Sequence, residues 1–525
     1  MHREWFTNLR YRVSSEQIRA ATAFRSAGDF MGACAATRVW PSFDLEAVGR
    51  EYGAALEREL ELTLQGFAPD LLRWNIPRNE HSITAGLKLR LVEWQWETPL
   101  ALWLETPRTA TSPQDLFLHF GPSPAGLSNL ERCHWDARHV AELLSHAGGR
   151  SRLPFFPPDG QARLWTWHTD PSSIDPALEP EARFEKVTLL QDRGNSGFAE
   201  AASWAGFEVT PEVIALTKSQ YSNYERWDLW PVQEIDLIRL NRLVRELHST
   251  AGVPSAYVRF GSWASRILWI HELDAARPLL DAVSVPDRAS KAEFPPKGAR
   301  EIAWHECSRS PDLERLRRGW LKPSELHPLV LRAFFPAWPG ELSEAGPAPV
   351  DDIEPLRVRC GEEWHWIGLR DGRVQALQHA PEQEAHEQVM AALGAPIPGC
   401  FRALQAWRSW GRSGRVPRRL RERLKELKTR VAHGDADGVF RFLEQDPALA
   451  QGSAGIGSSG SSMLHYLPWL GVECLPRLLA LGLDLEARDL EGQTPLQVAL
   501  KEGRPEVAAA LLAVGAKPAP PETSP

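Results

Sequence analysis

The sequence predicts an α+β protein of several domains: a mixed helix and strand body, a small β-meander, and a C-terminal solenoid of about three helix pairs. Over residues 1–400 the spacing of apolar residues alternates between the helical period of 3.6 and the strand period of two. Beyond them, apolar helical stretches are separated by single glycines. The 525 residues are 43% apolar and 24% charged, which excludes a mainly disordered, collagen-like or coiled-coil chain.

Residues 1–150 form the first predicted domain, a helical region with a β-hairpin. Ser14 and Gln17 have the spacing of a capping box ahead of a helix. Residues 46–65 continue with apolar residues one helical turn apart. Residues 87–104 then alternate apolar and polar side chains on both sides of a proline, which predicts two paired strands. A further helix is expected over 135–147.

Residues 151–345 form the second predicted domain, an α+β segment of unknown function. The signals are N-cap residues followed by proline or acidic residues, and short apolar runs. They predict helices that begin near Thr210, Val232, Ser310 and Ser324, and strands over 256–272 and 300–306.

Residues 346–400 form a third predicted domain, a three-stranded β-meander followed by a helix. Asp371-Gly372 lies between two alternating runs, which is a strong hairpin signal. The helix is expected over 381–393, where Gly394 ends it. Residues 401–525 form the last predicted domain, with a basic helix, the helix pairs and a disordered tail.

Residues 489–516, DLEGQTPLQVALKEGRPEVAAALLAVGA, closely resemble an ankyrin repeat. A preceding copy matches through Leu464-His465, and a degenerate first copy begins near residue 416. Segments 311–336 and 357–410 also resemble parts of long bacterial ankyrin-repeat proteins whose N-terminal region has no assigned activity. The residues that match the repeat pattern, at turns, caps and core positions, are Gly434, Leu464, Gly471, Gly492, Thr494, Pro495, Leu496, Ala499, Gly503, Leu511, Leu512 and Gly515.

The resemblance implies a non-catalytic interaction or scaffold protein that recruits a protein partner. Ankyrin repeats bind through their turn tips and the adjoining face of the first helix. The corresponding residues here are Arg488, Leu490, Glu491, Gln493 and Gln497. Each helix pair buries its apolar face against a neighbour. We therefore expect a stack of only about three pairs to pack against the rest of the chain or against a partner.

Two alternatives remain at this stage. An enzyme of unknown reaction in residues 160–340 would use His271, His305, Glu306 and Cys307, with the repeats as a targeting arm. The favoured interpretation of these residues is ordinary sheet positions with partners. Nucleic-acid attachment would use the Lys/Arg-rich segment 408–430, but no nucleic-acid motif accompanies the charge, and a solvated helix face is favoured.

Other features of the sequence predict that several kinds of site and segment are absent. The 6 cysteines lie far apart without a Cys-x-x-Cys pair, so we expect reduced thiols, no metal site and no cofactor. The sequence has no phosphate-binding loop and no Gly-x-Ser-x-Gly elbow. It also has no apolar run long enough to span a bilayer and no apolar signal core at its start, which predicts a cytoplasmic protein without a membrane partner.

Overall fold

A computed structural model describes most of the chain, in two compact units. The first unit comprises residues 1–77, 87–105 and 117–346, and the second comprises 78–86, 106–116 and 347–525. None of the described helices combines the length and the apolar character that crossing a bilayer requires. The described residues are 13–79, 82–109, 112–160, 164, 169–177, 179–193, 195–210, 234–260, 265–285, 298–319, 321–340, 356–360, 363–370, 373–379, 381–394, 396–408, 418–445, 448–451, 461–489 and 491–518.

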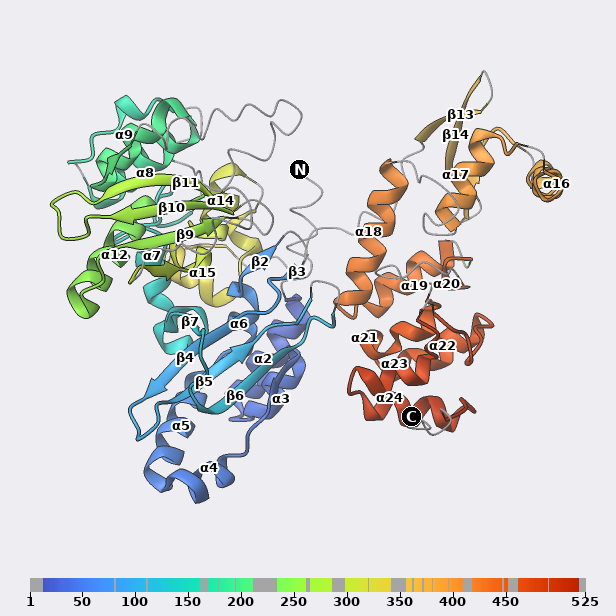
Figure 1. The fold of residues 1–525 in the computed structure, drawn as a ribbon, viewed down its shortest axis with the longest axis horizontal. Coiled ribbons are helices and arrows are strands. Elements are labelled where there is room, and N and C mark those ends of the chain that lie inside the picture. Colours follow the sequence, from blue (N-terminus) through green and yellow to red (C-terminus); the bar gives the residue numbers. More distant parts are fainter. Residues whose placement is uncertain are drawn as a thin grey trace. The chain divides into compact units, whose positions relative to one another are not determined.

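The first unit begins with helices and a five-stranded sheet (Figure 1). The predicted capping box is confirmed, because Ser14 Oγ accepts from Gln17 N at 3.1 Å and Gln17 Oε1 accepts from Ser14 N. The predicted hairpin is confirmed as well, and the sheet around it is larger than predicted, with order β1-β6-β5-β4-β7. The elements are α2 Ser15–Ser26, α3 Phe30–Ala36, β1 Val39–Pro41, α4 Leu45–Tyr52, α5 Ala54–Gly66, α6 Pro69–Asn75, β4 Lys88–Trp94, β5 Leu100–Glu105, β6 Leu116–Pro122 and β7 Ser128–Asn129.

Short helical turns follow this sheet. The helix predicted over 135–147 is instead a 3-10 segment that passes into one α-helical turn at its end. The helix predicted from Thr210 lies outside the described residues. The elements here are η1 Arg132–His134, η2 Ala137–Glu142, α7 Leu143–His146, η3 Pro171–Ser173, α8 Pro180–Asp192 and α9 Asn195–Ala205.

A second five-stranded sheet has the order β12-β9-β10-β11-β8, with antiparallel pairs at its centre and parallel pairs at its edges. Apolar residues of this sheet form one core with α8, α9 and α12. The strand predicted over 300–306 is wrong in its second half, where the chain turns into α13. The elements are β8 Glu208–Val209, α12 Leu237–Ala251, β9 Ala256–Phe260, β10 Ser265–His271, β11 Leu279–Val285, β12 Arg300–Ile302 and α13 Trp304–Cys307.

The end of the first unit is helical. Ser310 caps α14, Pro311–Arg318, as predicted. The helix predicted at Ser324 is only the 3-10 turn η5, Pro323–Glu325. The α-helix proper is α15, Pro328–Phe334, whose cap is His327. A proline at the first position of each element fixes where it starts.

The second unit contains the β-meander. Strands β13 Leu356–Cys360, β14 Glu363–Arg370 and β15 Arg373–Ala376 pair antiparallel in sequence order, as predicted. Helix α16, Pro381–Ala392, matches the predicted helix, and α17 follows over Gly399–Arg408. Strands β2 Arg78–Asn79 and β3 Ser82–Ile83 form a separate small hairpin in this unit.

Three helix pairs follow the meander, drawn in orange to red in Figure 1. Gly434, Gly471 and Gly503 lie between the helices of the three pairs with φ of 68°, 99° and 67°, a backbone region that favours glycine. The pairs are α18 Arg418–Ala432 with α19 Ala436–Gln445, then η6 Met463–Tyr466 and α21 Leu467–Leu470 with η7 Val472–Cys474 and α22 Leu475–Ala480, and finally α23 Pro495–Lys501 with α24 Pro505–Ala513. Helix α20, Ala448–Gln451, follows the first pair.

One continuous apolar core joins the meander to the last helix pair, from Ile367 through Trp407 and Leu464 to Leu511. The prediction that Leu512 belongs to this core is wrong. Leu511 is fully buried, but Leu512 is 47% exposed. Neighbouring helical residues point about 100° apart, and no described helix pair follows α24 to cover its outer side.

The helix pairs also contact an earlier part of the chain. In segment 106–116, the backbone N–H of Gln114 donates to the Ala432 carbonyl at 3.1 Å, and Asp115 forms an ion pair with Arg504. Asp115 is almost fully buried there. The helix pairs therefore pack against another part of the chain, as we expected for a stack of so few pairs.

Candidate functional site

The predicted partner-binding turn precedes α23. Asp489 Oδ1 accepts from the amides of Glu491 and Gln493 at 2.9 and 2.8 Å, and Arg488 donates to the Gly492 carbonyl at 2.7 Å. Gly492 has a φ of 76°. These bonds fix the turn backbone from within the turn itself. Leu490, the predicted apolar tip, lies outside the described residues.

The five predicted contact residues differ in their exposure and in the contacts that they make within the protein. Arg488 and Glu491 are exposed, and Gln493 is half-buried. Lys501 on α23 lies 3.1 Å from the Glu491 carboxylate, with both side chains more than half exposed. Gln497 is a capping residue instead, because its side chain accepts from the Thr494 amide at 2.8 Å.

His465 joins the second helix pair to this turn. Its Nδ1 accepts from the Ser462 amide at 3.0 Å, so Nε2 carries the proton and donates to the Gln493 carbonyl at 3.0 Å. Burial lowers the pKa of His465, which favours this neutral form. The Ser462 amide donates to the His465 side chain as the Thr494 amide donates to the Gln497 side chain, so η6 and α23 begin with the same N-cap contact.

His305 and Cys307, two residues of the enzyme alternative, do not share a face. His305 and Cys307 lie on one turn of α13, about 200° apart around the helix axis, whereas a strand would have brought them to one face. The Cys307 thiol is buried against the Ala303 and Trp304 carbonyls, and burial raises its pKa far above the usual range.

The other members of this set have structural partners. His305 Nε2 lies 3.3 Å from the Asn129 carbonyl, and Glu306 accepts from the Asn129 amide at 3.0 Å. His271, at the end of β10, stacks on Trp269 with ring centroids 4.6 Å apart. These contacts favour the interpretation of His271, His305 and Glu306 as ordinary structural positions.

The basic segment 408–430 is not uniformly a solvated face. Arg430 is fully buried, donates to Glu426 at 2.8 Å and to Asp435 at 3.0 Å, and lies over the Phe442 ring. Arg421 is exposed, and residues 409–417 lie outside the described part of the chain. The Arg430 guanidinium is therefore used in contacts within the protein and not for binding a phosphate.

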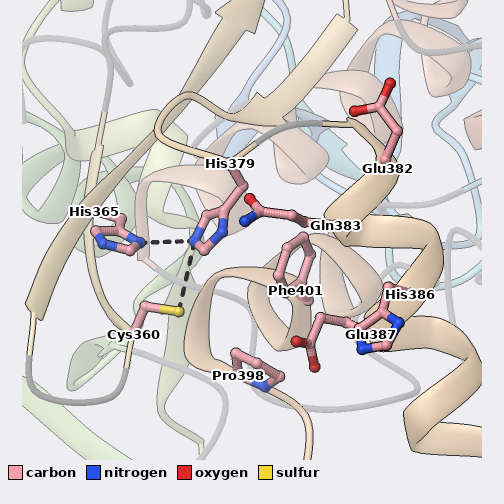
Figure 2. A pocket seen from close by; sticks show the side chains of 9 residues that line it. All are labelled: Cys360, His365, His379, Glu382, Gln383, His386, Glu387, Pro398 and Phe401. Atoms are coloured by element: carbon pink, nitrogen blue, oxygen red, sulfur yellow. Dashed lines mark hydrogen bonds between the residues drawn. The ribbon is translucent and has the colours of Figure 1, made fainter.

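The structure brings together four residues that sequence analysis did not connect. Cys360, His365, His379 and Cys400 each offer one ligand atom, and these atoms all lie within 4.8 Å of one another. His365 Nδ1 is 2.7 Å from His379 Nε2, which is 3.7 Å from Cys360 Sγ (Figure 2). We call this set the Cys/His cluster. Among the described residues it is the group of three or more His, Cys, Asp or Glu side chains that could hold a metal ion.

Polar and aromatic side chains surround the Cys/His cluster. Gln383 on α16 hydrogen-bonds to His379, and the Glu387 carboxylate favours positive charge there. The Phe401 ring lies 4.7 Å from that of His379. A hollow of about 530 Å³ opens beside these groups, with Glu382 and His386 also in its wall (Figure 2).

A signal for the Cys/His cluster was present in the sequence. Cys360 and His365 flank the predicted turn near Gly361, and on an antiparallel hairpin residues placed in this way share a face. The expectation of no metal site rested on the absence of a Cys-x-x-Cys pair, and a cysteine and a histidine five residues apart do not form one. No sequence spacing points to Cys400, which lies on helix α17 and reaches the other three residues only in the folded chain.

Comparisons with known proteins cover a small part of the chain. No family model matches it, and no solved structure matches it significantly. Over 87 residues it is 34% identical to protein phosphatase 1 regulatory subunit 27 of Homo sapiens, and equally to that of Mus musculus. The match covers 16% of this chain and 54% of each relative, so the chain spans about half the length of the curated relatives it matches.

Proposed function

We propose that this protein binds a partner protein through its C-terminal, ankyrin-type helix pairs and acts as a non-catalytic scaffold. The main support is the turn before α23. Its backbone is fixed by Asp489, while Arg488 and Glu491 remain exposed. A rigid backbone that presents exposed side chains loses little conformational entropy on binding.

The exposed Glu491 carboxylate contributes little to the fold. The Glu491–Lys501 pair is more than half exposed on both sides, and such pairs are worth about 0–1 kcal/mol. Charges that the fold does not need are available to steer and orient a partner. The partial similarity to a phosphatase regulatory subunit agrees with a role in protein binding.

The repeated local geometry supports the ankyrin-type assignment. A Ser or Thr N-cap with a His or Gln three residues later occurs at both Ser462 and Thr494, and a glycine with positive φ separates the helices of each pair. Repeats of this kind expose their turns along one edge. The proposal places the partner on the edge that contains Arg488, Glu491 and Lys501.

Charge reversal tests this proposal. The variant Arg488→Glu with Glu491→Lys is compared with wild type in quantitative affinity purification of the full chain. Each captured partner is then purified and its binding is measured by titration calorimetry. Glu506→Lys, an exposed change at the start of α24, is the matched control. We expect one partner to lose at least about tenfold in affinity with the double variant and to bind the control normally.

The melting temperatures of the three proteins separate lost recognition from lost folding. Weakened binding with unchanged melting supports the turn as the recognition surface. If every captured partner binds the double variant and wild type equally, the turn is not the interface and the proposal is wrong.

A further inference from the structure

The geometry points to a structural zinc site formed by Cys360, His365, His379 and Cys400. Two thiolates and two imidazoles are a ligand set of structural zinc sites, and each residue here supplies one donor atom to a common point. This site lies in the meander and α17, away from the turn before α23, and does not depend on the proposed partner binding.

Strand register brings the first two ligands together. His365 on β14 is directly opposite Val358 on β13, so their side chains are on the same face of the hairpin. Cys360 is two residues beyond Val358 and therefore shares that face. The hairpin alone aligns one thiol and one imidazole.

The other two ligands come from the segments that flank α16. His379 lies in the turn after β15, where its amide bonds to the Ala376 carbonyl at 3.1 Å. Cys400 is in the first turn of α17 and is fully buried. It can approach Cys360 because residue 399 is glycine, since a Cβ there would overlap the Arg359 carbonyl oxygen.

The observed distances fit zinc after small side-chain movements. With Zn–S near 2.3 Å and Zn–N near 2.0–2.1 Å, a tetrahedron places ligand atoms about 3.3–3.8 Å apart. The Cys360–His379 separation of 3.7 Å is within this range. The His365–His379 separation of 2.7 Å has to widen by about half an ångström, and no pair exceeds 4.8 Å.

Zinc binding at this point is coupled to proton release. The metal binds cysteine as the thiolate and histidine as the neutral imidazole, so the two thiol protons pass to solvent when Zn²⁺ is bound.

The donor set selects the metal and the role. Thiolate and imidazole ligands favour zinc over magnesium and calcium, which prefer oxygen donors. Four protein ligands leave no open position for water or substrate, so the site is structural and not catalytic. The hydrogen bond between the His379 ring and the Gln383 side chain is an outer contact that holds such a ligand in orientation.

The zinc would link the meander to helix α17. Ile367, Val374 and Ala376 of the meander are buried in the apolar core that also contains residues of α17. A zinc ion joins β13 and β14 to α17, whose Phe401 and Trp407 belong to the core of the helix pairs.

Metal content of the purified full chain tests this inference. We expect about one zinc per chain by inductively coupled plasma mass spectrometry, with metal reduced at least tenfold in Cys400→Ser and in His379→Ala. Cys474→Ser and His386→Ala are the matched controls. The first changes another buried cysteine of the same core, and the second changes a histidine of the same hollow that is not a ligand. Both controls should keep their zinc.

A titration of the wild type keeps the test informative if the ligand variants misfold. Cobalt added to the metal-free full chain should give thiolate charge-transfer and tetrahedral ligand-field absorption that saturates at one equivalent, and zinc should abolish it. The inference is overturned if the wild type binds neither metal stoichiometrically. It is also overturned if the control variants lose zinc as the ligand variants do, or if Cys360 and Cys400 are joined in a disulfide.

Discussion

His365 Nδ1 and His379 Nε2 lie 2.7 Å apart, with their rings inclined at 67°. Two ring nitrogens at this distance share one proton, since two N–H groups cannot face each other, and a zinc ion bound by both would hold them about 3.3 Å apart. Cys360 Sγ lies 3.7 Å from the same His379 nitrogen, so the shared point also has a thiol beside it. The stability of the meander should therefore respond to metal.

Chelation tests this link between metal and fold. We expect a strong chelator to increase protease cleavage within residues 356–408, because structural zinc contributes its binding free energy to folding. Mass spectrometry of the fragments gives the cleavage sites. Cys400→Ser should already be cleaved without chelator and should not respond further. Equal cleavage of the wild type with and without chelator would contradict the expected role of the metal.

Two adjacent leucines of α24 should differ sharply in their effect on stability. Leu511 is fully buried, and Leu511→Ala should destabilise the last helix pair by about 2–5 kcal/mol. Leu512 is 47% exposed, and Leu512→Asp should cost less than about 1 kcal/mol. Hydrogen exchange of α23 and α24 measures both. Similar losses of protection in the two variants would show that the assignment of the buried face is wrong.

Arg430 should be a stability residue. Its replacement by Met leaves Glu426 and Asp435 without the buried guanidinium and should cost about 3 kcal/mol. Arg421→Met, an exposed change on the same helix, should stay within about 0.5 kcal/mol. Pulse proteolysis in urea gives both values. Reduced nucleic-acid binding by a stably folded Arg430→Met variant would instead revive the phosphate-binding alternative.

The first unit should lose stability in mild acid. The His134 and His146 rings lie with centroids 4.3 Å apart, and burial, with Arg239 nearby, holds the pKa of both below the usual value. The unfolded chain then binds more protons below about pH 6.5, so unfolding becomes easier as pH falls towards the folded pKa values. We expect a loss of about 1 kcal/mol per histidine between pH 7.5 and 5.5 in urea denaturation.

A variant separates this histidine pair from the other acid-sensitive groups. His146→Gln removes one of the two half-buried imidazoles and should reduce the pH dependence of stability by about half of the pair's contribution. An unchanged slope between pH 7.5 and 5.5 would show that other groups control the acid response.

Local sequence signals predicted the elements that begin or end at a recognisable cap or turn. The capping box at Ser14, the cap at Ser310 and the strands of the meander appear where predicted. Around His305 the apolar alternation was too short to distinguish a strand from the single helical turn of α13. Leu512 was assigned to the core by its position in a repeat, and the assignment failed because its exposure depends on whether another pair follows.

The Cys/His cluster shows why sites are harder to predict than elements. Cys360 and His365 meet through strand register, which a correctly predicted hairpin already implies. His379 and Cys400 join them through the path of the chain around α16 and the close approach at Gly399, and these depend on tertiary packing. Periodicity and short motifs contain no information about such contacts.

X-ray absorption at the zinc edge is the most direct test of the metal centre, because it reports the atoms bound to the ion in the full chain. Two sulfur ligands at about 2.3 Å and two nitrogen ligands at about 2.0–2.1 Å are expected. Cys400→Ser with residual zinc should show one sulfur fewer, while Cys474→Ser should give the wild-type spectrum. A wild-type spectrum with only oxygen and nitrogen ligands would contradict a centre formed by Cys360, His365, His379 and Cys400.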